Sequence, residues 1–334
     1  IEEKMSNLTL SMCDSHDLWD EFIKHSPQYN IFCQTAFLKS LGTNFELWWV
    51  MDRNIPCLGA IVIKGGDGQP VRAPYPFSLY QGILFNHKYS LMQCHQRVNE
   101  SLRLIDFLLT EFKQIYSRIS FCLHPKIDDV RGFSWFNYHE PEYGNFHTGI
   151  SYTGIIDLTD KYDFEDYLMA IRKSRRYEYR KACKEKMFVE SSKDFDLLEK
   201  LYIQTFERQD ISVDASALKI LRSIAESALD KKYGELTVCR NEQGEALSAA
   251  LFLYDDNCCY YMVGANNPDH RQTGSGVFIV LENIRIFQSK GYKYIDVCGL
   301  NSPSRGGFKS SLNAMPTPYY VTTWESQNRK IRDE

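Results

Sequence analysis

The sequence has ten cysteines but no C-x-x-C pair and no regular spacing between them. A disulfide scaffold or a zinc-binding module needs such spacing, so both classes are excluded. The nearest metal-like fragment is Cys122-Leu123-His124, and it has no further ligands close by in the sequence. We therefore expect reduced, buried thiols and no metal site.

Long apolar runs are also absent, because no segment approaches the roughly 18 to 20 apolar residues that span a bilayer. The N-terminal residues IEEKMSNLTL lack the basic and apolar regions of a signal peptide. We therefore expect a cytoplasmic protein without a transmembrane segment. The net charge is only −4, which at the level of the whole chain gives no reason to expect DNA or a membrane surface as a partner.

What the chain does have is the length and pattern of a two-domain α/β protein. Its 334 residues suggest two domains, and its 21 Tyr and 20 Phe suit strand-rich cores. Helices, a hairpin, a strand, a helix and a strand are predicted twice in that order. The first half has expected helices from Ser15 to before Pro27 and over 35–41 and 90–116, and strands over 45–51, 57–64, 78–85 and 118–124. The second half has expected helices over 164–186, 194–209, 216–230 and from Gly276, and strands over 235–241, 246–254, 258–266 and 292–299.

The stretch HRQTGSGVFIVLENIRIFQSKG, from His270 to Gly291, follows an expected strand. Arg271, Gly274 and Gly276 have the spacing R-x-x-G-x-G and precede apolar residues at helical spacing. Backbone N–H groups at a helix N-terminus lack partners and face a positive dipole end, and glycine permits close approach. With the charge of Arg271, the combination suits a pyrophosphate. The alternative is a plain strand-to-helix turn. The helix should bury Val277, Val280, Leu281, Ile284 and Phe287.

This spacing is neither G-x-G-x-x-G nor the Walker loop. It is similar to the Q/R-x-x-G-x-G/A loop that cradles the pyrophosphate of acyl-coenzyme A in GNAT-type acyltransferases. The order of strands and helices around it also follows the GNAT order. Gln272, Thr273 and Ser275 would belong to the same donor loop.

Further stretches resemble the FemAB-like, or BioF2-like, proteins, which carry tandem GNAT-type domains. The resemblance implies an α/β fold of two GNAT-like domains, each a mixed central sheet flanked by helices. It places an acceptor-cleft domain without a donor loop at 1–155 and a donor-binding domain at 156–334. The stretches are SPQYNIFCQTAFLKSLG, YTGIIDLTD, RKSRRYEYRKACKEKMFVE, FERQDI, YYMVGANN, GYKYIDVCGLN and GGFKSSLNA.

Two features depart from the family. Its closing F-K-x-x-F-G-G is here Phe308-Lys309-Ser310-Ser311-Leu312-Asn313-Ala314, which puts the shape of the acceptor pocket in doubt. The chain also lacks the charged coiled-coil arm that aminoacyl-tRNA-dependent cell-wall members often carry. That absence favours a thioester donor, while tRNA stays a less favoured partner.

The resemblance implies direct attack of an acceptor amine on the donor carbonyl. A backbone N–H of the strand ending at Tyr261–Gly264 would stabilise the oxyanion. Asp296, flanked by apolar residues, or a tyrosine would remove the amine proton, and Lys309 would neutralise negative charge. The alternatives are a buried Asp held by backbone donors and an exposed loop lysine.

The remaining predicted contacts follow from the same resemblance. Val263 joins the donor site, and Arg208 would contact the acceptor unless it forms a helix-end ion pair. The predicted catalytic residues are Asp296, Tyr261 and Lys309, and the predicted acceptor residues are Arg208, Tyr260, Asn301 and Phe308.

The segment 171–186 has eight Lys and Arg against two Glu. Such a basic helix could bind a polyphosphate, a nucleotide-sugar, an anionic membrane or the tRNA of an aminoacyl donor. The alternative is a solvated helix face.

The sequence thus predicts an N-acyltransferase with acyl-coenzyme A as co-substrate and no permanently bound cofactor. The acceptor would be a small-molecule amine, with an amino sugar, a nucleotide- or lipid-linked sugar or another cell-envelope precursor as candidates. Two alternatives stay open: an aminoacyl-tRNA-dependent transferase of the peptidoglycan-bridge type, and a non-catalytic binding module. The oligomeric state is left open.

Overall fold

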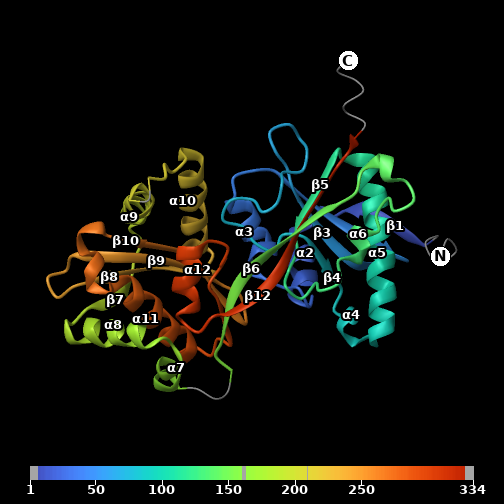
Figure 1. Ribbon diagram of the computed structural model, residues 1–334. Helices are drawn as coiled ribbons and strands as arrows, with labels where there is room; N and C mark the ends of the chain where they lie inside the picture. Colours follow the sequence, from blue (N-terminus) through green and yellow to red (C-terminus); the bar gives the residue numbers. More distant parts are fainter. Residues whose placement is uncertain (1–6, 160–162, 209, 328–334) are drawn as a thin grey trace. The chain divides into compact units, whose positions relative to one another are not determined.

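The computed structural model describes residues 7–159, 163–208 and 210–327, with the backbone alone at Arg271. The chain divides into two compact units (Figure 1). The first consists of the residues up to Ser151 and those from Pro318 onwards, and the second is Tyr152–Thr317. Strands β6 (His147–Asp157) and β12 (Met315–Glu325) have residues in both.

The C-terminal segment belongs to a different unit from the one expected, because the expected boundaries assigned everything after residue 155 to the second domain. In the structure the residues from Pro318 belong to the first unit. The reason is strand pairing, because β12 pairs antiparallel with β5 (Arg118–Cys122) from Val321 to Glu325.

The first unit contains a four-stranded antiparallel sheet in the order β1-β2-β3-β4. The predicted hairpin is confirmed: Arg53 and Asn54 have φ values of 51° and 65°, which a two-residue hairpin loop of type I′ requires. The strand predicted over 78–85 is limited to its last three residues, because Phe77 and Tyr80 have positive φ values of 58° and 56°. The strands are β1 (Leu8–Met12), β2 (Phe45–Asp52), β3 (Ile55–Ile63) and β4 (Ile83–Phe85).

Helix α5 is the long helix of the first unit, and it packs Leu104, Leu108 and Phe112 into the core formed with the sheet. The single helix predicted over 90–116 is divided in two, because Met92 and Gln93 have extended backbone with ψ of 151° and 154°. The helices of this unit are α2 (His16–Lys24), η1 (Ile31–Cys33), α3 (Thr35–Ser40), α4 (Lys88–Leu91), α5 (Cys94–Ile115), α6 (Arg131–Ser134) and η2 (Pro141–Tyr143).

The second unit contains a mixed sheet in the order β6-β11-β10-β9-β8-β7. Strands β10 and β11 run parallel, and the other neighbouring pairs are antiparallel. The predicted hairpin of the second half is present as β8 and β9. The strands are β7 (Phe188–Ser191), β8 (Gly234–Arg240), β9 (Ala246–Tyr254), β10 (Cys258–Asn266) and β11 (Tyr294–Asp296).

Helix α11 packs against β8, β9 and β10, and all five residues of its predicted apolar face are buried. The helical region predicted over 164–186 forms two helices, because Ile171 and Arg172 are extended with ψ of 165° and 134°. The helices of this unit are α7 (Phe164–Ala170), α8 (Lys173–Lys184), α9 (Phe195–Glu207), α10 (Ala215–Asp230), η3 (Pro268–Thr273), α11 (Ser275–Ser289) and α12 (Pro303–Ser310).

Candidate active site

The loop between β10 and α11 turns on a glycine that the backbone requires. Gly274 has φ 80° and ψ 9°, a left-handed conformation, and forms the N-cap of α11. This conformation costs other residues about 1–2 kcal/mol. Ahead of it, the Thr273 hydroxyl donates to the carbonyl of His270 at 2.6 Å and accepts from the N–H of Ser275 at 3.3 Å. The loop is therefore held in place by its own side chain.

The first turn of α11 has an N–H group without a partner. The N–H groups of Val277 and Phe278 both donate to the carbonyl of Gly274, at 3.1 and 3.0 Å. Within the described part of the chain, the N–H of Gly276 has no acceptor. A Cβ at Gly276 would lie 2.4 Å from Oδ1 of Asn266. The turn thus offers a free donor at the positive end of a helix, which is the arrangement that binds phosphates.

The other residues predicted for donor binding lie around this turn. Ser275 is buried, and its carbonyl accepts from Ser248 Oγ at 3.2 Å. Gln272 is exposed, and Val263 is buried in β10. The side chain of Arg271 lies outside the described residues, so its contact with a phosphate stays a prediction.

Strand β10 separates from β11 beside this loop. The parallel pairing ends at Tyr260 and Asp296, although β10 continues for six more residues. On the other side, the register with β9 shifts between Tyr261 and Val263, so Met262 is an extra, bulged residue. Within the described residues, the segment 261–265 therefore has no strand partner on its β11 side. This is the separated strand in which we expect the oxyanion-binding N–H.

The ring of Tyr261 covers the backbone of this separated segment. A Cβ at Gly264 would lie only 1.7 Å from the hydroxyl of Tyr261. The ring stacks on Phe252, with centroids 5.2 Å apart, and Nζ of Lys309 lies 5.9 Å from its centroid. Burial raises the pKa of Tyr261, so the phenol stays protonated at neutral pH and serves as a hydrogen-bond donor.

Lys309 lies on α12 and reaches the turn after β11. Its Nζ donates to the carbonyl of Cys298 and, at 3.1 Å, to that of Gly299. Burial lowers the pKa of this ammonium group. Lys309 is therefore a helical, partly buried cation and not the exposed loop lysine of the alternative interpretation.

Asp296 is buried, with 2% of its surface exposed. Its Oδ1 accepts from Thr153 Oγ1 at 2.5 Å and from the N–H of Cys298 at 2.8 Å. The carboxylate thus ties β6 to the turn that Lys309 also binds. The structure brings the three predicted catalytic residues, Tyr261, Asp296 and Lys309, to the end of β11, where the separation of the strands begins.

Two of the predicted acceptor residues are occupied elsewhere. The hydroxyl of Tyr260 donates to Asp255 Oδ2 at 2.7 Å, and the side chain is buried. The amide of Asn301 pairs with the backbone of Tyr152, accepting its N–H at 2.7 Å and donating to its carbonyl at 3.1 Å. Both contacts hold the fold, although Tyr260 is also the register partner of Asp296 in the β10–β11 pairing.

Phe308 and Arg208 complete the predicted set. Arg208 is exposed at the C-cap of α9, with no ion pair among the described residues. Phe308 precedes Lys309 on α12, and its ring faces the guanidinium of Arg175 at 5.2 Å. Phe308 is therefore the predicted acceptor residue that lies on the same helix as Lys309.

The sequence placed Arg175 and Glu178 in the basic segment 171–186 but gave neither of them a role in the site; both lie on α8. Nη1 of Arg175 lies 2.9 Å from both carboxylate oxygens of Glu178, and its Nε donates to Ser311 Oγ at 2.9 Å. A Cβ at Gly274 would lie 3.3 Å from the Cβ of Glu178. Helix α8 thus connects α12 with the donor loop, and the i,i+3 spacing of this ion pair was the available signal.

Met262 and Cys298 also escaped the sequence reasoning. Sδ of Met262 and Sγ of Cys298 lie 3.9 Å apart, so the two side chains meet across the gap between the separating strands. Cys298 has a positive φ of 51°. Burial raises the pKa of its thiol well above the usual range, so it is a neutral lining group.

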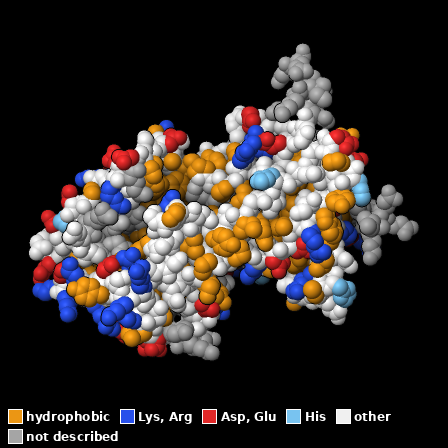
Figure 2. All heavy atoms as spheres, viewed as in Figure 1, with side chains coloured by type: hydrophobic (Ala, Val, Ile, Leu, Met, Phe, Trp, Pro, Cys, Tyr) orange, Lys and Arg blue, Asp and Glu red, His pale blue; other side chains and the backbone are white. Residues whose placement is uncertain are grey.

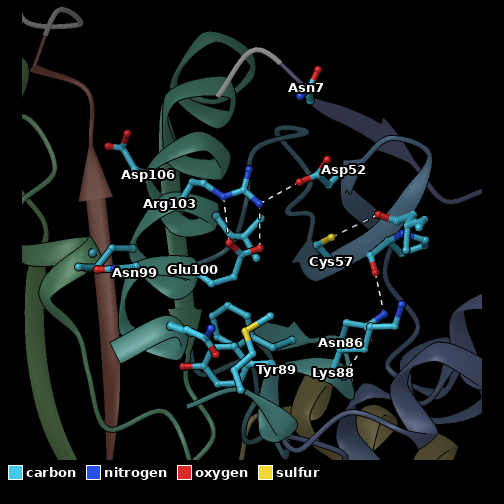
Figure 3. A pocket seen from close by; sticks show the side chains of 18 of the residues that line it. Asn7, Asp52, Cys57, Asn86, Lys88, Tyr89, Asn99, Glu100, Arg103 and Asp106 are labelled. Carbon is cyan, nitrogen blue, oxygen red and sulfur yellow. Dashed lines mark hydrogen bonds and ion pairs between the residues drawn. The ribbon is translucent and has the colours of Figure 1, made fainter. Parts of the chain in front are cut away.

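A broad hollow lies on the first unit, beside the β2–β3 turn, α4 and α5 (Figure 3). At its centre, Arg103 Nη2 lies 3.0 Å from Asp52 Oδ2 and 2.8 Å from Glu100 Oε1. The one guanidinium is thus shared by two carboxylates, and none of the predicted site residues lines the hollow. We assign it no role.

Among the described residues, no three His, Cys, Asp or Glu side chains are arranged to hold a metal ion. None of the helices that the structure describes is long and apolar enough to span a bilayer.

Comparisons with known proteins agree with this architecture. Residues 169–309 match the family model of the acetyltransferase (GNAT) domain. The chain is similar in structure to FemX, with 14% identity, a TM-score of 0.67 and coverage of 97% of this chain and 99% of that one. No curated protein matches it by sequence.

Two further structures share the fold. One is the C-terminal domain of a putative lysylphosphatidylglycerol synthetase from Agrobacterium fabrum, with 10% identity, a TM-score of 0.53 and 95% of both chains covered. The other is a tandem GNAT protein from the clavulanic acid biosynthesis pathway, with 9% identity, a TM-score of 0.53 and coverage of 96% of this chain and 98% of that one. The chain shares its fold with FemX and with a tandem GNAT protein, and residues 169–309 of its second unit match the GNAT acetyltransferase domain.

Proposed function

We propose that the chain is an N-acyltransferase that transfers an acyl group from acyl-coenzyme A to an amine. The observation that carries this proposal is the partnerless N–H of Gly276 at the start of α11, beside the separated and bulged part of β10. The matching GNAT domain model includes both elements.

The donor loop would bind the pyrophosphate of the donor. The left-handed Gly274 turns the chain so that the first N–H groups of α11 lie at the helix end, where the dipole is positive. Arg271 is the proposed cationic contact, and Gln272 and Thr273 follow it in the loop.

The acyl carbonyl would lie against the bulged segment of β10. A backbone N–H at Met262 or Val263 would donate to the oxyanion that forms during attack. One such donor is worth about 3–4 kcal/mol in the transition state.

In the proposed reaction the amine nitrogen attacks the carbonyl carbon, the C–S bond breaks and the thiolate leaves. Tyr261, whose phenol stays protonated because burial raises its pKa, would donate a hydrogen bond to the thiolate, which would take up a proton from solvent. Lys309 would neutralise the negative charge that develops on the leaving thiolate. Asp296 stays the predicted acceptor of the amine proton, held by Thr153 and Cys298.

An aminoacyl-tRNA is the second candidate donor, and the contact between Met262 and Cys298 favours it. A pantetheine arm that passes between the strands must displace the flexible Met262 side chain. An aminoacyl ester at the end of a nucleic acid could present its carbonyl without crossing the gap. The acceptor would then be a peptidoglycan-type precursor, whereas the acyl-coenzyme A reading fits an amino sugar or another envelope amine.

Thermal-shift titration with coenzyme A, acetyl-coenzyme A, uncharged tRNA and aminoacyl-tRNA tests the donor. A ligand at a hundredfold excess over its Kd stabilises the folded chain by about 2.7 kcal/mol, so acetyl-coenzyme A should raise the melting temperature. If only aminoacyl-tRNA does so, the acyl-coenzyme A donor is wrong. If neither binds, the transferase proposal is wrong.

The variant Gly276→Ala tests the loop itself. Its Cβ meets Asn266 Oδ1 and should disturb a charge-assisted hydrogen bond worth about 1.5–3 kcal/mol. Donor binding should weaken by about ten- to a hundredfold. Gly307→Ala on α12 is the matched control, because its Cβ meets nothing within 4 Å. Equal affinity of Gly276→Ala and wild type would place the donor elsewhere.

A further inference from the structure

Helix α8 has an outward face that neither the fold nor the proposed reaction uses. Lys173, Tyr177, Arg180 and Lys184 follow one another at intervals of four, three and four residues, so they share one side of the helix. All four are exposed, and Tyr177 is 70% exposed. The other side of α8 buries Tyr179 and Ala182 in the core that it shares with α11.

The charge of this region is one-sided. The segment 172–186 has eight Lys and Arg and two Glu, in a chain whose net charge is −4. The two Glu pair with Arg175 and Lys181. From the neighbouring helix α7, Glu165 lies 3.7 Å from Arg180, and both of these side chains are largely exposed. Figure 2 shows Lys and Arg side chains gathered over the region that α8 occupies in Figure 1.

Two large apolar side chains stand among these cations. Met169, at the end of α7, is 61% exposed, and Tyr177 is 70% exposed. Arg176 links them, because it is adjacent to Tyr177 and its Nη1 donates to the carbonyl of Met169 at 2.8 Å. We define the cationic face as Lys173, Arg176, Tyr177, Arg180 and Lys184 with Met169.

We propose that the cationic face docks on an anionic lipid bilayer. The charges of Lys173, Arg180 and Lys184 run along about 16 Å of one straight helix, which suits a flat surface of lipid phosphates. Tyr177 and Met169 would enter the boundary between headgroups and acyl chains, where apolar and aromatic side chains are favourable. This surface would hold the enzyme at the membrane without a spanning helix.

The apolar side chains favour a bilayer over RNA. An RNA backbone would pair with the same cations, but it offers no apolar phase to Met169. Tyr177 could stack only on an unpaired base. A bilayer covers the charged and the apolar members of the face together.

Co-sedimentation of the full chain with vesicles tests the proposal. We expect binding to phosphatidylcholine vesicles that contain phosphatidylglycerol, no binding to phosphatidylcholine alone, and weaker binding as salt rises. A basic residue near an anionic bilayer contributes about 1 kcal/mol, or about fivefold in partitioning. The variant Lys173→Gln/Arg180→Gln/Lys184→Gln should therefore bind on the order of a hundredfold more weakly.

A matched triple variant carries the same change of charge elsewhere in the second unit. Lys193→Gln/Lys200→Gln/Lys219→Gln alters three exposed lysines outside α8 and should bind vesicles like wild type. Tyr177→Ser should weaken binding several-fold while leaving its salt dependence unchanged. If the α8 triple variant loses its circular dichroism spectrum, Lys184→Gln alone should show the fivefold loss.

Three results would overturn the proposal. Wild type could fail to bind phosphatidylglycerol vesicles at low salt, or both triple variants could lose binding equally. Alternatively, tRNA could bind in a fluorescence-anisotropy assay and the α8 triple variant abolish that binding alone. The last result would assign the face to a nucleic acid.

Discussion

Replacing Gly264 by alanine tests how tightly Tyr261 is fixed over the separated part of β10. The new Cβ would lie 1.7 Å from the Tyr261 hydroxyl, 2.7 Å from Cζ and 3.3 Å from Cε2. The contacts at 1.7 and 2.7 Å are far shorter than van der Waals contact, so the ring would have to move away from the new Cβ. Gly264→Ala therefore cannot be accommodated by the tyrosine in its present position.

The size of the effect follows from what holds the ring. Tyr261 is stacked on Phe252 and lies below Lys309, and an aromatic pair of this kind contributes about 0.5–1.5 kcal/mol. Overpacking of a filled site costs about 1–3 kcal/mol. We expect Gly264→Ala to lower the free energy of unfolding by about 1–3 kcal/mol.

Urea denaturation can assign this loss to the second unit. All five tryptophans belong to the first unit, so their fluorescence follows that unit, whereas far-ultraviolet circular dichroism follows both. The circular dichroism transition should shift to lower urea more than the fluorescence transition does. Gly307→Ala, which meets no atom within 4 Å, should be neutral or stabilise α12 by up to about 1 kcal/mol.

A double-mutant cycle identifies the obstacle. In a Tyr261→Ala background the ring is gone, so Gly264→Ala should cost nothing or stabilise by about 0.5–1 kcal/mol. The coupling energy should therefore be about 1–4 kcal/mol. An equal cost in both backgrounds would show that Tyr261 does not lie over Gly264, and its proposed hydrogen bond to the leaving thiolate would lose its support.

Three further predictions concern the same group of residues. If the reaction needs the Lys309 cation, kcat/KM should begin to fall at a pH below the usual lysine pKa of 10.5, because burial lowers the pKa of this group. Lys309→Arg should remove this fall, since an arginine stays charged to pH above about 12. A pH profile that the substitution leaves unchanged would contradict the role of the cation. Thr153→Val leaves the buried Asp296 carboxylate with one donor fewer and should destabilise the chain by about 1–3 kcal/mol; an unchanged melting temperature would argue against the contact. Met262→Ala opens the gap opposite Cys298 and should shift donor preference toward longer acyl groups in a competition assay, whereas an unchanged preference would place the acyl group outside the gap.

Local patterns predicted those parts of the fold whose causes are local. The spacing of Val277, Val280 and Leu281 predicted the buried face of α11, and the turn residues after Asp52 predicted the first hairpin. The glycine spacing likewise predicted the position of Gly274 at the start of α11. In each case the residues that interact lie within a few positions of one another.

Contacts between distant segments could not be read in this way. The Thr153 hydroxyl and the Asp296 carboxylate are 143 positions apart, and Arg175 and Ser311 are 136 apart. The bulge at Met262 depends on its register against β9, and no residue type marks it. Strand β4 is short because Phe77 and Tyr80 have positive φ values. The apolar sequence 78–85 predicts a continuous strand and gives no sign of this conformation.

The difference between the two units supports a single donor site in the second one. In the first unit the chain ahead of β4 stays bonded to β5: the N–H of Cys122 donates to the carbonyl of Gln81 at 3.2 Å. A Cβ at Gly82 would lie 3.2 Å from the Cys122 carbonyl oxygen, so no gap remains for a ligand.

The helix that follows β4 and α4 in the first unit is also closed to an anion. Before α5, the N–H of Gln93 donates to Gln96 Oε1 at 3.1 Å, whereas α11 begins at a glycine and keeps a donor without a partner at Gly276. Among the residues that the structure describes, only the second unit combines two separating parallel strands, β10 and β11, with a helix that begins with an N–H group lacking a partner. Calorimetric titration with coenzyme A should therefore give one site per chain, and Gly276→Ala should weaken that site and uncover no second one.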